Sequence, residues 1–442
     1  MPIIIFVLLL LPLPLFAVDV GQSDIPLTIS STGTYELTEN ITYADGNAIT
    51  VTTSNAVVIR GKGGTKYSIT CTGGHGIYSN NQYGTLTIYD LTINMNDANT
   101  CIYLANSTGS KSVTVHDVDM NISLDYGGEA NGLWFTGGSA TLTGSMYSCT
   151  VVFSGLYSGT NRSSAFAVTY PSSSAVTPFE ICSNTITITG HLTNGIRIFS
   201  GDNFVIRNNT ITADSGSDNT KSIQIDEGSD GCKVYSNNID INASDSTGNS
   251  YGIRIRAGVV GNYIYSNTIN VEDSTGSGSY GVALGYSDGS DVNGVLIHDN
   301  IITGKDGNIP AMLYNASGDG TGNDFYCNTL VNTGTGACVY FYPVTSATPV
   351  YNLRFSGDTM TTSGNYAIVM PAWCDEGSLD NVSFCGMTVN GSALTAGHVN
   401  DVDSVGGWSI TSAPCAYSCD SSPSAASPAS LSGGTISGGS FR

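Results

Sequence analysis

The chain has 442 residues, with 14 Lys and Arg against 35 Asp and Glu, and a formal net charge of −21 at pH 7. Only 11% of its residues are charged and 54 are Gly, so long helices lack their usual composition and an all-β chain is expected. The negative charge repels phosphate backbones and anionic membranes, and no cluster of Lys and Arg resembles a nucleic-acid groove. Nucleic acid is therefore excluded as a partner.

The first residues predict a signal peptide. An apolar run from Ile3 to Phe16 is short for a membrane span, and Ala17 is a small residue at the expected cleavage site. No Lys or Arg precedes the run, and Leu15 stands where a small residue is preferred, so an uncleaved anchor is the alternative. We expect residues 1–17 to be removed and the mature protein to be secreted or held at the cell surface.

One strand-like segment recurs along the rest of the chain at a nearly constant period. The last apolar residue of each copy gives a series with steps of 25 to 35 residues: Ile93, Met120, Val151, Ile186, Ile211, Ile239, Ile269, Ile302, Leu330, Met360 and Val389. A second segment with alternating apolar and polar residues precedes most copies, and a short third strand follows some. Two or three strands per turn of about thirty residues predict a parallel β-helix of about 11–12 coils.

An Asn column supports this fold. Two places before the aligned apolar residue stand Asn184, Asn209, Asn237, Asn267, Asn300 and Asn328, followed by Asp358. Asn tolerates a left-handed backbone, and stacked Asn amides can form hydrogen bonds from coil to coil at a bend. We expect one vertical column with a structural role.

The periodic strands, the Asn column and the opening residues 33–42 and 48–52 resemble the pectate-lyase-like right-handed parallel β-helix superfamily. The resemblance runs from about residue 25 to 400. It is closest to the broad repeat family found in carbohydrate-binding proteins and sugar hydrolases, whose motifs specify coils rather than one reaction. It implies an all-β, right-handed parallel β-helix solenoid and an extracellular polysaccharide as partner.

The composition divides the chain into segments. We expect residues 18–420 to form the β-helix with its terminal caps, 421–430 to be a Ser/Pro/Ala linker, and 431–442 to be a Gly-rich, strand-like tail. The tail is too short to fold alone, so it either adds a strand to its own last coil or docks on a neighbouring molecule. Terminal disorder is the alternative.

The eleven cysteines are odd in number, so at least one lies outside any disulfide within the chain. Three pairs are close enough in sequence to bond locally: Cys374 with Cys385, Cys327 with Cys338, and Cys415 with Cys419. Buried free thiols are the alternative. The cysteines form no CxxC doublet and the five His are scattered, so no zinc site is predicted.

The resemblance invites comparison with pectin-degrading enzymes. Polygalacturonases line their sugar site with a Gly-His-Gly and an Arg-Ile-Lys element, and the nearest equivalents here are residues 74–76 and 254–256. These lie six coils apart, so one sugar ring cannot meet both, and His75 is expected to be a turn residue. Pectate lyases combine calcium with an Arg base, and no matching local motif is present.

The second strand places charged side chains on one outer face. If its Ile residues point inward, the polar residues between them stack outside in successive coils. This face would carry Arg197, Gln224, Arg254, Asp226 and Arg256, with Glu227 and Asp230 in the adjoining loop. The cluster could bind an acidic sugar, with Asp226 or Glu227 as proton acceptor and Arg254 neutralising the carboxylate. A surface ion-pair network is the alternative.

Two aromatic rows accompany these strands. Tyr286, Tyr314, Tyr340 and Tyr342 would extend the charged face into a long substrate-binding groove. A second row lies outside the repeated segment: Tyr89, His116, Tyr147, Tyr235, Tyr265, His298 and Tyr326. Its rings could stack on sugars, but stacking on one another is favoured.

Acidic loop residues recur from coil to coil: Asp97, Asp125, Asp214, Asp245, Asp273 and Asp306. Their oxygens could share Ca²⁺, although no calcium-loop signature is present and solvated acids are the simpler interpretation. No cofactor is required. Thr-x-Thr pairs are not sustained across coils, which disfavours an ice-binding array.

Two functional hypotheses follow. The first is a protein that binds, and could cleave as a lyase or hydrolase, an extracellular polysaccharide along the face with Arg197, Asp226 and Arg254. The second is a structural surface protein or adhesin that self-assembles through its ends or tail.

Overall fold

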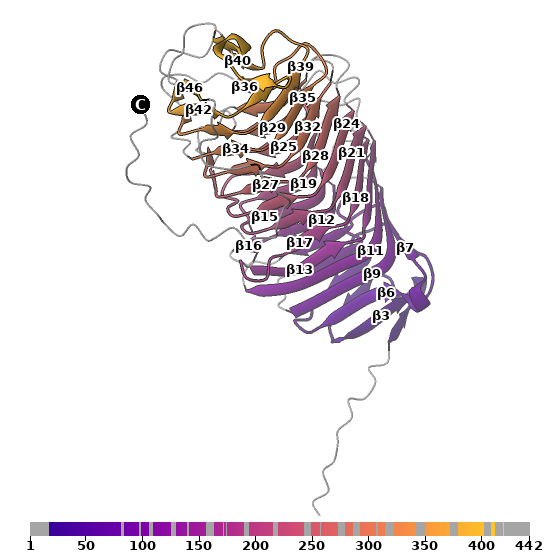
Figure 1. The fold of residues 1–442 in the computed structure, drawn as a ribbon. Helices are drawn as coiled ribbons and strands as arrows, with labels where there is room; N and C mark the ends of the chain where they lie inside the picture. The colour runs from indigo at the N-terminus through magenta and orange to yellow at the C-terminus, as the bar shows by residue number, and fades with distance from the viewer. Residues whose placement is uncertain are drawn as a thin grey trace, which may run out of the picture.

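The computed structural model describes residues 17–419 except for 81–83, 97–98, 106–108, 125–129, 139–140, 156–162, 171, 174, 190–193, 215–219, 243–248, 257, 273–278, 286–291, 306–307, 314–321, 342–349, 372–378, 402–407 and 412–418. The predicted signal-peptide core, linker and tail lie outside these residues. The described chain winds as stacked coils, from those with β3 and β6 at one end to those with β40 and β46 at the other (Figure 1).

One sheet receives a single strand from each coil. It contains 14 strands, in this order: β2 (Leu27–Ile29), β5 (Ile49–Val51), β8 (Ile77–Asn80), β10 (Ile102–Ala105), β12 (Asn131–Thr136), β15 (Ser164–Thr169), β19 (Asn194–Phe199), β22 (Lys221–Ile225), β25 (Tyr251–Ile255), β29 (Tyr280–Leu284), β33 (Ile309–Leu313), β36 (Val339–Phe341), β40 (Ile368–Met370) and β45 (Val399–Asp401).

The second sheet has 28 strands, mostly two per coil. They are β1 (Val18–Val20), β3 (Gly33–Leu37), β4 (Ile41–Tyr43), β6 (Val57–Gly61), β7 (Tyr67–Cys71), β9 (Gly84–Asn96), β11 (Ser110–Leu124), β13 (Thr141–Tyr147), β14 (Thr150–Gly155), β16 (Ser172–Ser173), β17 (Glu180–Cys182), β18 (Thr185–Thr189), β20 (Val205–Arg207), β21 (Thr210–Asp214), β23 (Lys233–Tyr235), β24 (Asn238–Asn242), β27 (Tyr263–Tyr265), β28 (Thr268–Glu272), β31 (Leu296–His298), β32 (Ile301–Gly304), β34 (Asp324–Tyr326), β35 (Thr329–Asn332), β38 (Arg354–Ser356), β39 (Thr359–Thr362), β42 (Val382–Cys385), β43 (Thr388–Val389), β44 (Ser392–Ala393) and β46 (Trp408–Thr411).

The remaining elements are short. Two small sheets pair β26 (Val259–Val260) with β30 (Val292–Asn293) and β37 (Val350–Tyr351) with β41 (Leu379–Asp380). Three 3₁₀ turns cover Gln22–Asp24, Lys62–Gly64 and Ala396–His398. Among the described residues, no helix is long and apolar enough to cross a membrane.

The predicted right-handed parallel β-helix is confirmed. Successive coils pair in parallel, as in Ile196 with Ile223 and Ile223 with Ile253, and within the described part of the chain only β43 and β44 pair antiparallel. Each of the eleven sequence repeats follows one strand of the 14-stranded sheet, from β8 before the first repeat to β40 before the last. The short strands β2, β5 and β45 extend the stack beyond them.

The core fills the interior of the coils with aligned apolar side chains. Ile196, Ile223 and Ile253 are fully buried and stand in one column, as their alternation with polar residues predicts. An inner column of the 28-stranded sheet becomes aromatic near the C-terminal end, where Ile297 is followed by Phe325 and Phe355, whose rings stack with their centroids 4.7 Å apart. A parallel sheet with apolar residues on its inner face and no free edge between coils is stable as a continuous solenoid.

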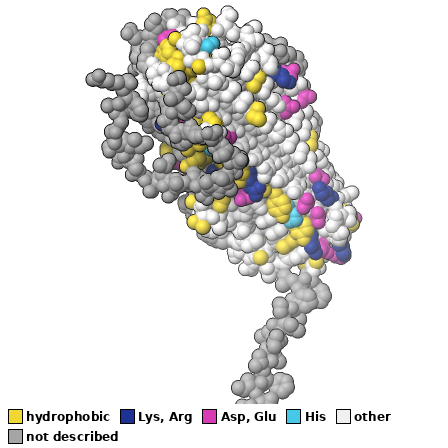
Figure 2. Space-filling model, viewed as in Figure 1, with side chains coloured by type: hydrophobic (Ala, Val, Ile, Leu, Met, Phe, Trp, Pro, Cys, Tyr) yellow, Lys and Arg dark blue, Asp and Glu magenta, His cyan; other side chains and the backbone are white. Residues whose placement is uncertain are grey.

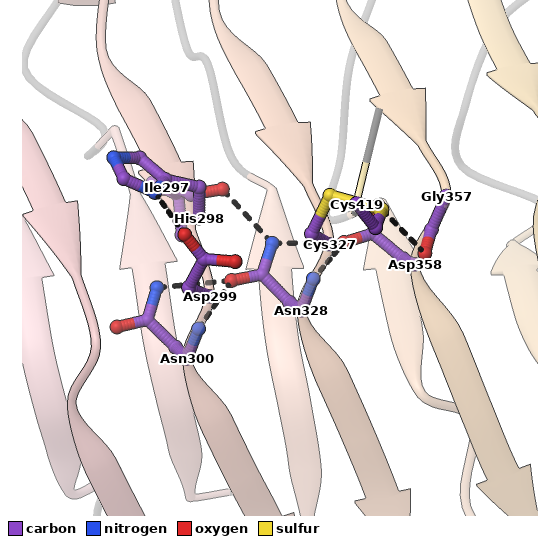
Figure 3. The surroundings of a disulfide bond; sticks show 9 residues. All are labelled: Ile297, His298, Asp299, Asn300, Cys327, Asn328, Gly357, Asp358 and Cys419. Carbon is purple, nitrogen blue, oxygen red and sulfur yellow. Dashed lines mark hydrogen bonds and ion pairs between the residues drawn. A yellow bond between two sulfur atoms is a disulfide. The ribbon is translucent and has the colours of Figure 1, made fainter. Parts of the chain in front are cut away.

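The Asn column is present as predicted. Asn300 Nδ2 donates to Asn328 Oδ1 at 2.9 Å, Asn328 Nδ2 donates to Asp358 Oδ1 at 2.8 Å, and the backbone N–H of each donor residue bonds to the same oxygen (Figure 3). The expected backbone conformation is wrong by one position. The left-handed residue is the one before each amide, such as Asn208 at φ 55° or Asp299 at φ 55°, and it makes the bend between strands.

The disulfide pattern differs from the local pairs suggested by the sequence. Cys327 bonds to Cys419 across a sequence separation of 92, so the pairings of Cys327 with Cys338 and of Cys415 with Cys419 are wrong. Stacking of coils brings distant segments together, which sequence spacing does not reveal. Cys385 is also disulfide-bonded. Six other cysteines are free and buried, as the alternative predicted: Cys71, Cys101, Cys149, Cys182, Cys232 and Cys338.

Candidate functional site

The outer face of the 14-stranded sheet carries the predicted site. In-register pairing aligns one outer side chain from each of eight successive coils: Tyr78, Tyr103, Trp134, Ala167, Arg197, Gln224, Arg254 and Ala283. The row is aromatic in the N-terminal coils and charged in the middle. Where the structure is described, most of the face in view in Figure 2 carries neither charged nor hydrophobic side chains.

Asp226 is the centre of the charged cluster. Its Oδ2 accepts hydrogen bonds from Arg197 Nε at 3.1 Å and Gln224 Nε2 at 2.6 Å, and its Oδ1 lies 3.0 Å from Arg256 Nη1. Asp226 is fully buried. The predicted gathering of Arg197, Gln224, Asp226 and Arg256 on one face is therefore present, and the buried carboxylate orients both guanidinium groups.

Glu227 is the accessible carboxylate beside this cluster. Its Oε1 lies 3.7 Å from Arg256 Nη2, and its side chain is 46% exposed, against 0% for Asp226. Of the two predicted proton acceptors, Glu227 can meet a ligand from solvent without displacing a buried ion pair. The catalytic roles of Asp226, Glu227 and Arg254 stay predictions.

Cationic side chains gather on these three adjacent strands. Arg254 lies over the ring of Tyr251, with its Cζ 4.8 Å from the centroid, and Lys221 is paired in register with Tyr251. Together with Arg197 and Arg256, they lie near the described carboxylates of Asp226 and Glu227. The sequence interpretation omitted Lys221, because by strict alternation it shares the side of Ile223 and Ile225, which point inward.

Asp230 does not belong to the cluster. Its backbone N–H donates to Asp202 Oδ1 at 3.0 Å, and its Oδ1 accepts from the Val260 N–H at 2.6 Å. Partial burial, opposed by the Val260 hydrogen bond, and the nearby negative charge of Asp202 raise the pKa of Asp230. Grouping it with the Arg residues is wrong, because the loop turns away after Glu227.

The predicted Tyr groove is largely untested. Tyr286, Tyr314 and Tyr342 lie outside the described residues. Tyr340 is half-buried and aligned with Met312. The outer face of β22, β25 and β29 is buried rather than open, because every side chain described in these strands is buried.

The accessible part of the face is an aromatic row that the sequence interpretation did not assign to ligand binding. The His75 and Tyr103 rings stack at 4.6 Å, Tyr78 stacks on Tyr103 at 5.5 Å, and Trp134 meets Tyr103 edge-on at 4.9 Å. Trp134 Nε1 donates to Thr169 Oγ1 at 3.2 Å. His75 lies just before β8, and burial lowers its pKa. The signal that could have found this row is an aromatic residue at the same outer position in three successive second strands.

Tyr170 and Phe199 connect the aromatic row to the charged cluster. Tyr170 is 55% exposed and its ring packs edge-on against Phe199 at 5.7 Å, while Arg197 Cζ lies 5.2 Å from the Phe199 centroid. Tyr170 has φ 75°, a conformation that is strained for a bulky side chain and is often found at functional sites. An exposed aromatic side chain is thus held beside Arg197.

The other aromatic row is structural, as favoured from the sequence. His298 stacks on Tyr265 at 5.0 Å and on Tyr326 at 4.5 Å, with nearly parallel planes, and His116 lies in the same way between Tyr89 and Tyr147. Ring faces inside the row are covered by neighbouring rings, so they are not free for sugars.

No metal site is found in the described segments. No three His, Cys, Asp or Glu side chains there gather closely enough to hold an ion. Of the predicted calcium-loop acids, only Asp214 is described, and it is exposed at the end of β21. The other five lie outside the described residues.

Among known proteins, no family model matches the chain, and no curated protein is significantly similar to it. Two similar solved structures are the A-modules of two mannuronan C-5 epimerases of Azotobacter vinelandii. AlgE6 has 16% identity, a TM-score of 0.39 and 90% coverage of both chains. AlgE4 has 14% identity, a TM-score of 0.41, and covers 84% of this chain and 91% of its own.

Proposed function

We propose that this protein is secreted or held at the cell surface and binds an anionic polysaccharide along the outer face of the 14-stranded sheet. The binding surface runs from the aromatic side chains of Tyr78, Tyr103 and Trp134 to the cluster around Arg197 and Arg256. A polyuronate fits this surface, because its rings offer apolar faces and its carboxylates offer partners for Arg.

The observation that carries the proposal is the local concentration of cations. Four of the 14 Lys and Arg lie on β19, β22 and β25 or directly after β25, in a chain with a net charge of −21. Asp226 holds the guanidinium groups of Arg197 and Arg256 in place. Guanidinium groups fixed in this way can also bind a carboxylate of a ligand.

The aromatic side chains give the second part of the argument. Trp134 and Tyr170 are partly or largely accessible, and flat rings pack on the apolar faces of sugars. They occupy successive coils, which suits an extended chain better than a single sugar.

Cleavage of the bound polysaccharide is a more specific proposal than binding. Glu227 would act as proton acceptor, since it is the exposed carboxylate, and the neighbouring Arg256 would contact a sugar carboxylate. The reaction would be that of a lyase or a hydrolase.

The experiment is a binding measurement with the full-length protein against a polyuronate and a neutral glucan of the same length. We expect binding to the polyuronate only, weakened by salt because the contacts are ionic. Trp134→Ala and Tyr170→Ala should each weaken it about tenfold, which corresponds to about 1.4 kcal/mol. Tyr366→Ala is the matched control, because Tyr366 is an exposed aromatic residue, 40% accessible, on another part of the rod.

A product assay on the same polyuronate separates binding from cleavage. Loss of product with Glu227→Gln and unchanged binding would support the catalytic role. Equal binding of neutral and acidic polymers, or unchanged affinity in both aromatic variants, would contradict the proposed surface.

A spacer or adhesin role is the second candidate. The observation that favours it is the unbroken stack of 14 in-register coils, stiffened by Asn and aromatic rows. Absence of any glycan binding together with self-association in light scattering would favour this role.

A further inference from the structure

The chain contains nine Asn-x-Ser/Thr sequences, the acceptor motif for N-linked glycans. Three of the nine asparagines lie outside the described residues. The other six are all exposed: Asn40, Asn121, Asn208, Asn242, Asn381 and Asn390. Exposure alone therefore does not distinguish these six acceptors, but the hydrogen bonds of their side-chain amides do.

Asn208 presents its side-chain amide to solvent at a bend. It lies between β20 and β21 with φ 55° and is one of the left-handed residues that turn the chain within the 28-stranded sheet. Its backbone N–H donates to the Tyr235 carbonyl at 3.3 Å, and its side-chain amide makes no hydrogen bond to the described part of the chain. Thr210, which supplies the hydroxyl of the motif, is exposed at the start of β21. Both groups that a transferase must recognise thus lie on the surface.

Asn209, the next residue, is the opposite case. It is 1% exposed, and its Nδ2 donates to the Ile181 carbonyl at 2.8 Å and to Asn237 Oδ1 at 2.9 Å. Because both N–H bonds of its amide are used, a sugar on Asn209 would break the Asn column. Of these two adjacent asparagines, one is structural and the other faces solvent.

Asn40 lies in the corresponding connection of an N-terminal coil, between β3 and β4. Its Oδ1 accepts from the Ser68 N–H at 2.9 Å, which orients the amide, and its Nδ2 has no partner among the described residues. Thr42, the hydroxyl residue of this motif, is exposed in β4. Asn40 can therefore carry a substituent on Nδ2 without losing a hydrogen bond.

Asn390 is exposed as well, but both ends of its amide are bonded to one residue. Its Oδ1 accepts from the Thr362 N–H at 3.1 Å, and its Nδ2 donates to the Thr362 carbonyl at 3.0 Å. Such a pair of bonds uses the N–H that lies cis to Oδ1. In a trans glycosyl amide, the sugar replaces that same hydrogen. A glycan on Asn390 would therefore remove this contact between coils.

We propose that Asn208 and Asn40 carry N-linked glycans and that Asn390 does not. This inference rests on the export proposed above, because the transfer takes place in the secretory pathway. The donor is a lipid-linked oligosaccharide diphosphate. Nδ2 forms a bond to C1 of the sugar as the bond from C1 to the phosphate oxygen breaks, the lipid diphosphate leaves, and a base of the transferase takes one Nδ2 proton.

The two glycans would stand along the bends of the 28-stranded sheet. No strand of the 14-stranded sheet contains an acceptor motif. The strands of the proposed polysaccharide-binding surface therefore carry no glycan of their own.

The test expresses the full-length chain in a eukaryotic cell line and collects it from the medium. Peptide N-glycosidase in heavy-oxygen water converts each glycosylated Asn into a labelled Asp, which peptide mass spectrometry locates. We expect the label on Asn208 and Asn40 in most molecules and on Asn390 in few.

Two variants sharpen the comparison. Thr210→Val destroys the motif of Asn208 at an exposed position and leaves the Asn column intact, so we expect the loss of one glycan, seen as a faster band on a gel, and an unchanged urea midpoint. Ser392→Thr is the matched control. It gives Asn390 the same Thr-containing motif as Asn208 and Asn40, and Asn390 should still be unlabelled in most molecules.

Exported protein with an unlabelled Asn208, or with Asn390 labelled as fully as Asn208, would overturn the inference and leave the proposed export standing. A chain that stays inside the cell without any label would overturn the inference together with the proposed export. Polysaccharide binding is measured separately, so neither result decides it.

Discussion

Asn328 Nδ2 donates to Asp358 Oδ1 at 2.8 Å, and at this bond the amide column ends. Asn328 also donates to the carbonyl of Ile297 at 2.9 Å. Phe325 is the register partner of Ile297 in the next coil, so its backbone carbonyl is the corresponding acceptor for the side chain of Asp358. Asp358 has an oxygen where the other residues have an amide nitrogen, and this Oδ2 is buried without a partner. Only the protonated acid can donate as the amides do.

Replacing Asp358 with Asn should therefore remove a pH dependence of stability. Burial raises the pKa of Asp358 from 3.8 to about 7. Between pH 3.8 and about 7, the folded protein keeps a proton on Asp358 that the unfolded chain loses. The contribution of Asp358 to the free energy of unfolding is therefore full below pH 3.8 and is lost as pH rises through about 7. The linked free energy is on the order of 4 kcal/mol. In urea unfolding, Asp358→Asn should resemble wild type near pH 4 and be more stable at pH 8.5.

The matched control is Asn300→Asp, in the middle of the same column. It should acquire the pH dependence that Asp358→Asn loses, because Asn300 Nδ2 donates to both Asn328 and the Ile264 carbonyl. If wild type and Asp358→Asn differed in unfolding free energy by the same amount at pH 4 and at pH 8.5, the explanation would be contradicted.

The Cys327–Cys419 disulfide should stabilise the C-terminal coils. It closes a separation of 92 residues, and cross-links over long loops typically contribute about 2–4 kcal/mol. We expect Cys419→Ser to lower the urea midpoint and to speed proteolysis near β46. A reductant should bring wild type and variant to the same level and should lower the midpoint of the variant less, because the variant has only the disulfide of Cys385 left to lose among the described bonds. Cys338→Ala controls for loss of a buried thiol, and equal stability of oxidised and reduced wild type would rule the role out.

Tyr265 should matter for stability and not for ligand binding. Its ring lies between Tyr235 at 4.7 Å and His298 at 5.0 Å. Removing both stacking contacts and the buried ring area in Tyr265→Ala should cost about 2 kcal/mol in thermal or urea unfolding. Polysaccharide affinity should stay at the wild-type value, in contrast to Trp134→Ala. A weaker affinity with unchanged stability would mean that the row is a binding surface after all.

Asp226 and Glu227 should respond differently to neutralisation. Asp226→Asn leaves the buried Arg256 and the half-buried Arg197 without their shared, fully buried carboxylate, so a loss of about 3–5 kcal/mol in unfolding free energy is expected. Glu227→Gln removes a largely exposed carboxylate 3.7 Å from Arg256, and its effect should stay below about 1 kcal/mol. Parallel urea titrations of the two variants decide the matter, and equal losses would contradict the assigned burial.

The solenoid and its Asn column could be predicted because each coil repeats the same constraint. One Asn per coil, two residues before a buried apolar residue, can be recognised in a single sequence. Its backbone conformation was assigned one residue too late, since Ser, Asp, Asn and Cys alternate at the true bend position and leave no single-letter signal.

Contacts that depend on what covers a face could not be predicted. The alternation of apolar and polar residues distinguishes inner from outer side chains. It does not reveal that the outer face of β25 is also buried, whereas Trp134 in β12 is accessible. The partner of Cys327 also escaped prediction, because proximity between coils is independent of separation along the chain.

The amide column makes each coil an interchangeable unit. Asn184 and Asn209 each donate to the next amide in the same way, at 3.0 and 2.9 Å. Excision of the coil that ends at Asn209 would leave Asn184 facing Asn237 with an identical set of donors and acceptors. Duplication or loss of whole coils during evolution therefore meets no chemical mismatch at the new junction, and rod length is free to vary while its cross-section is conserved.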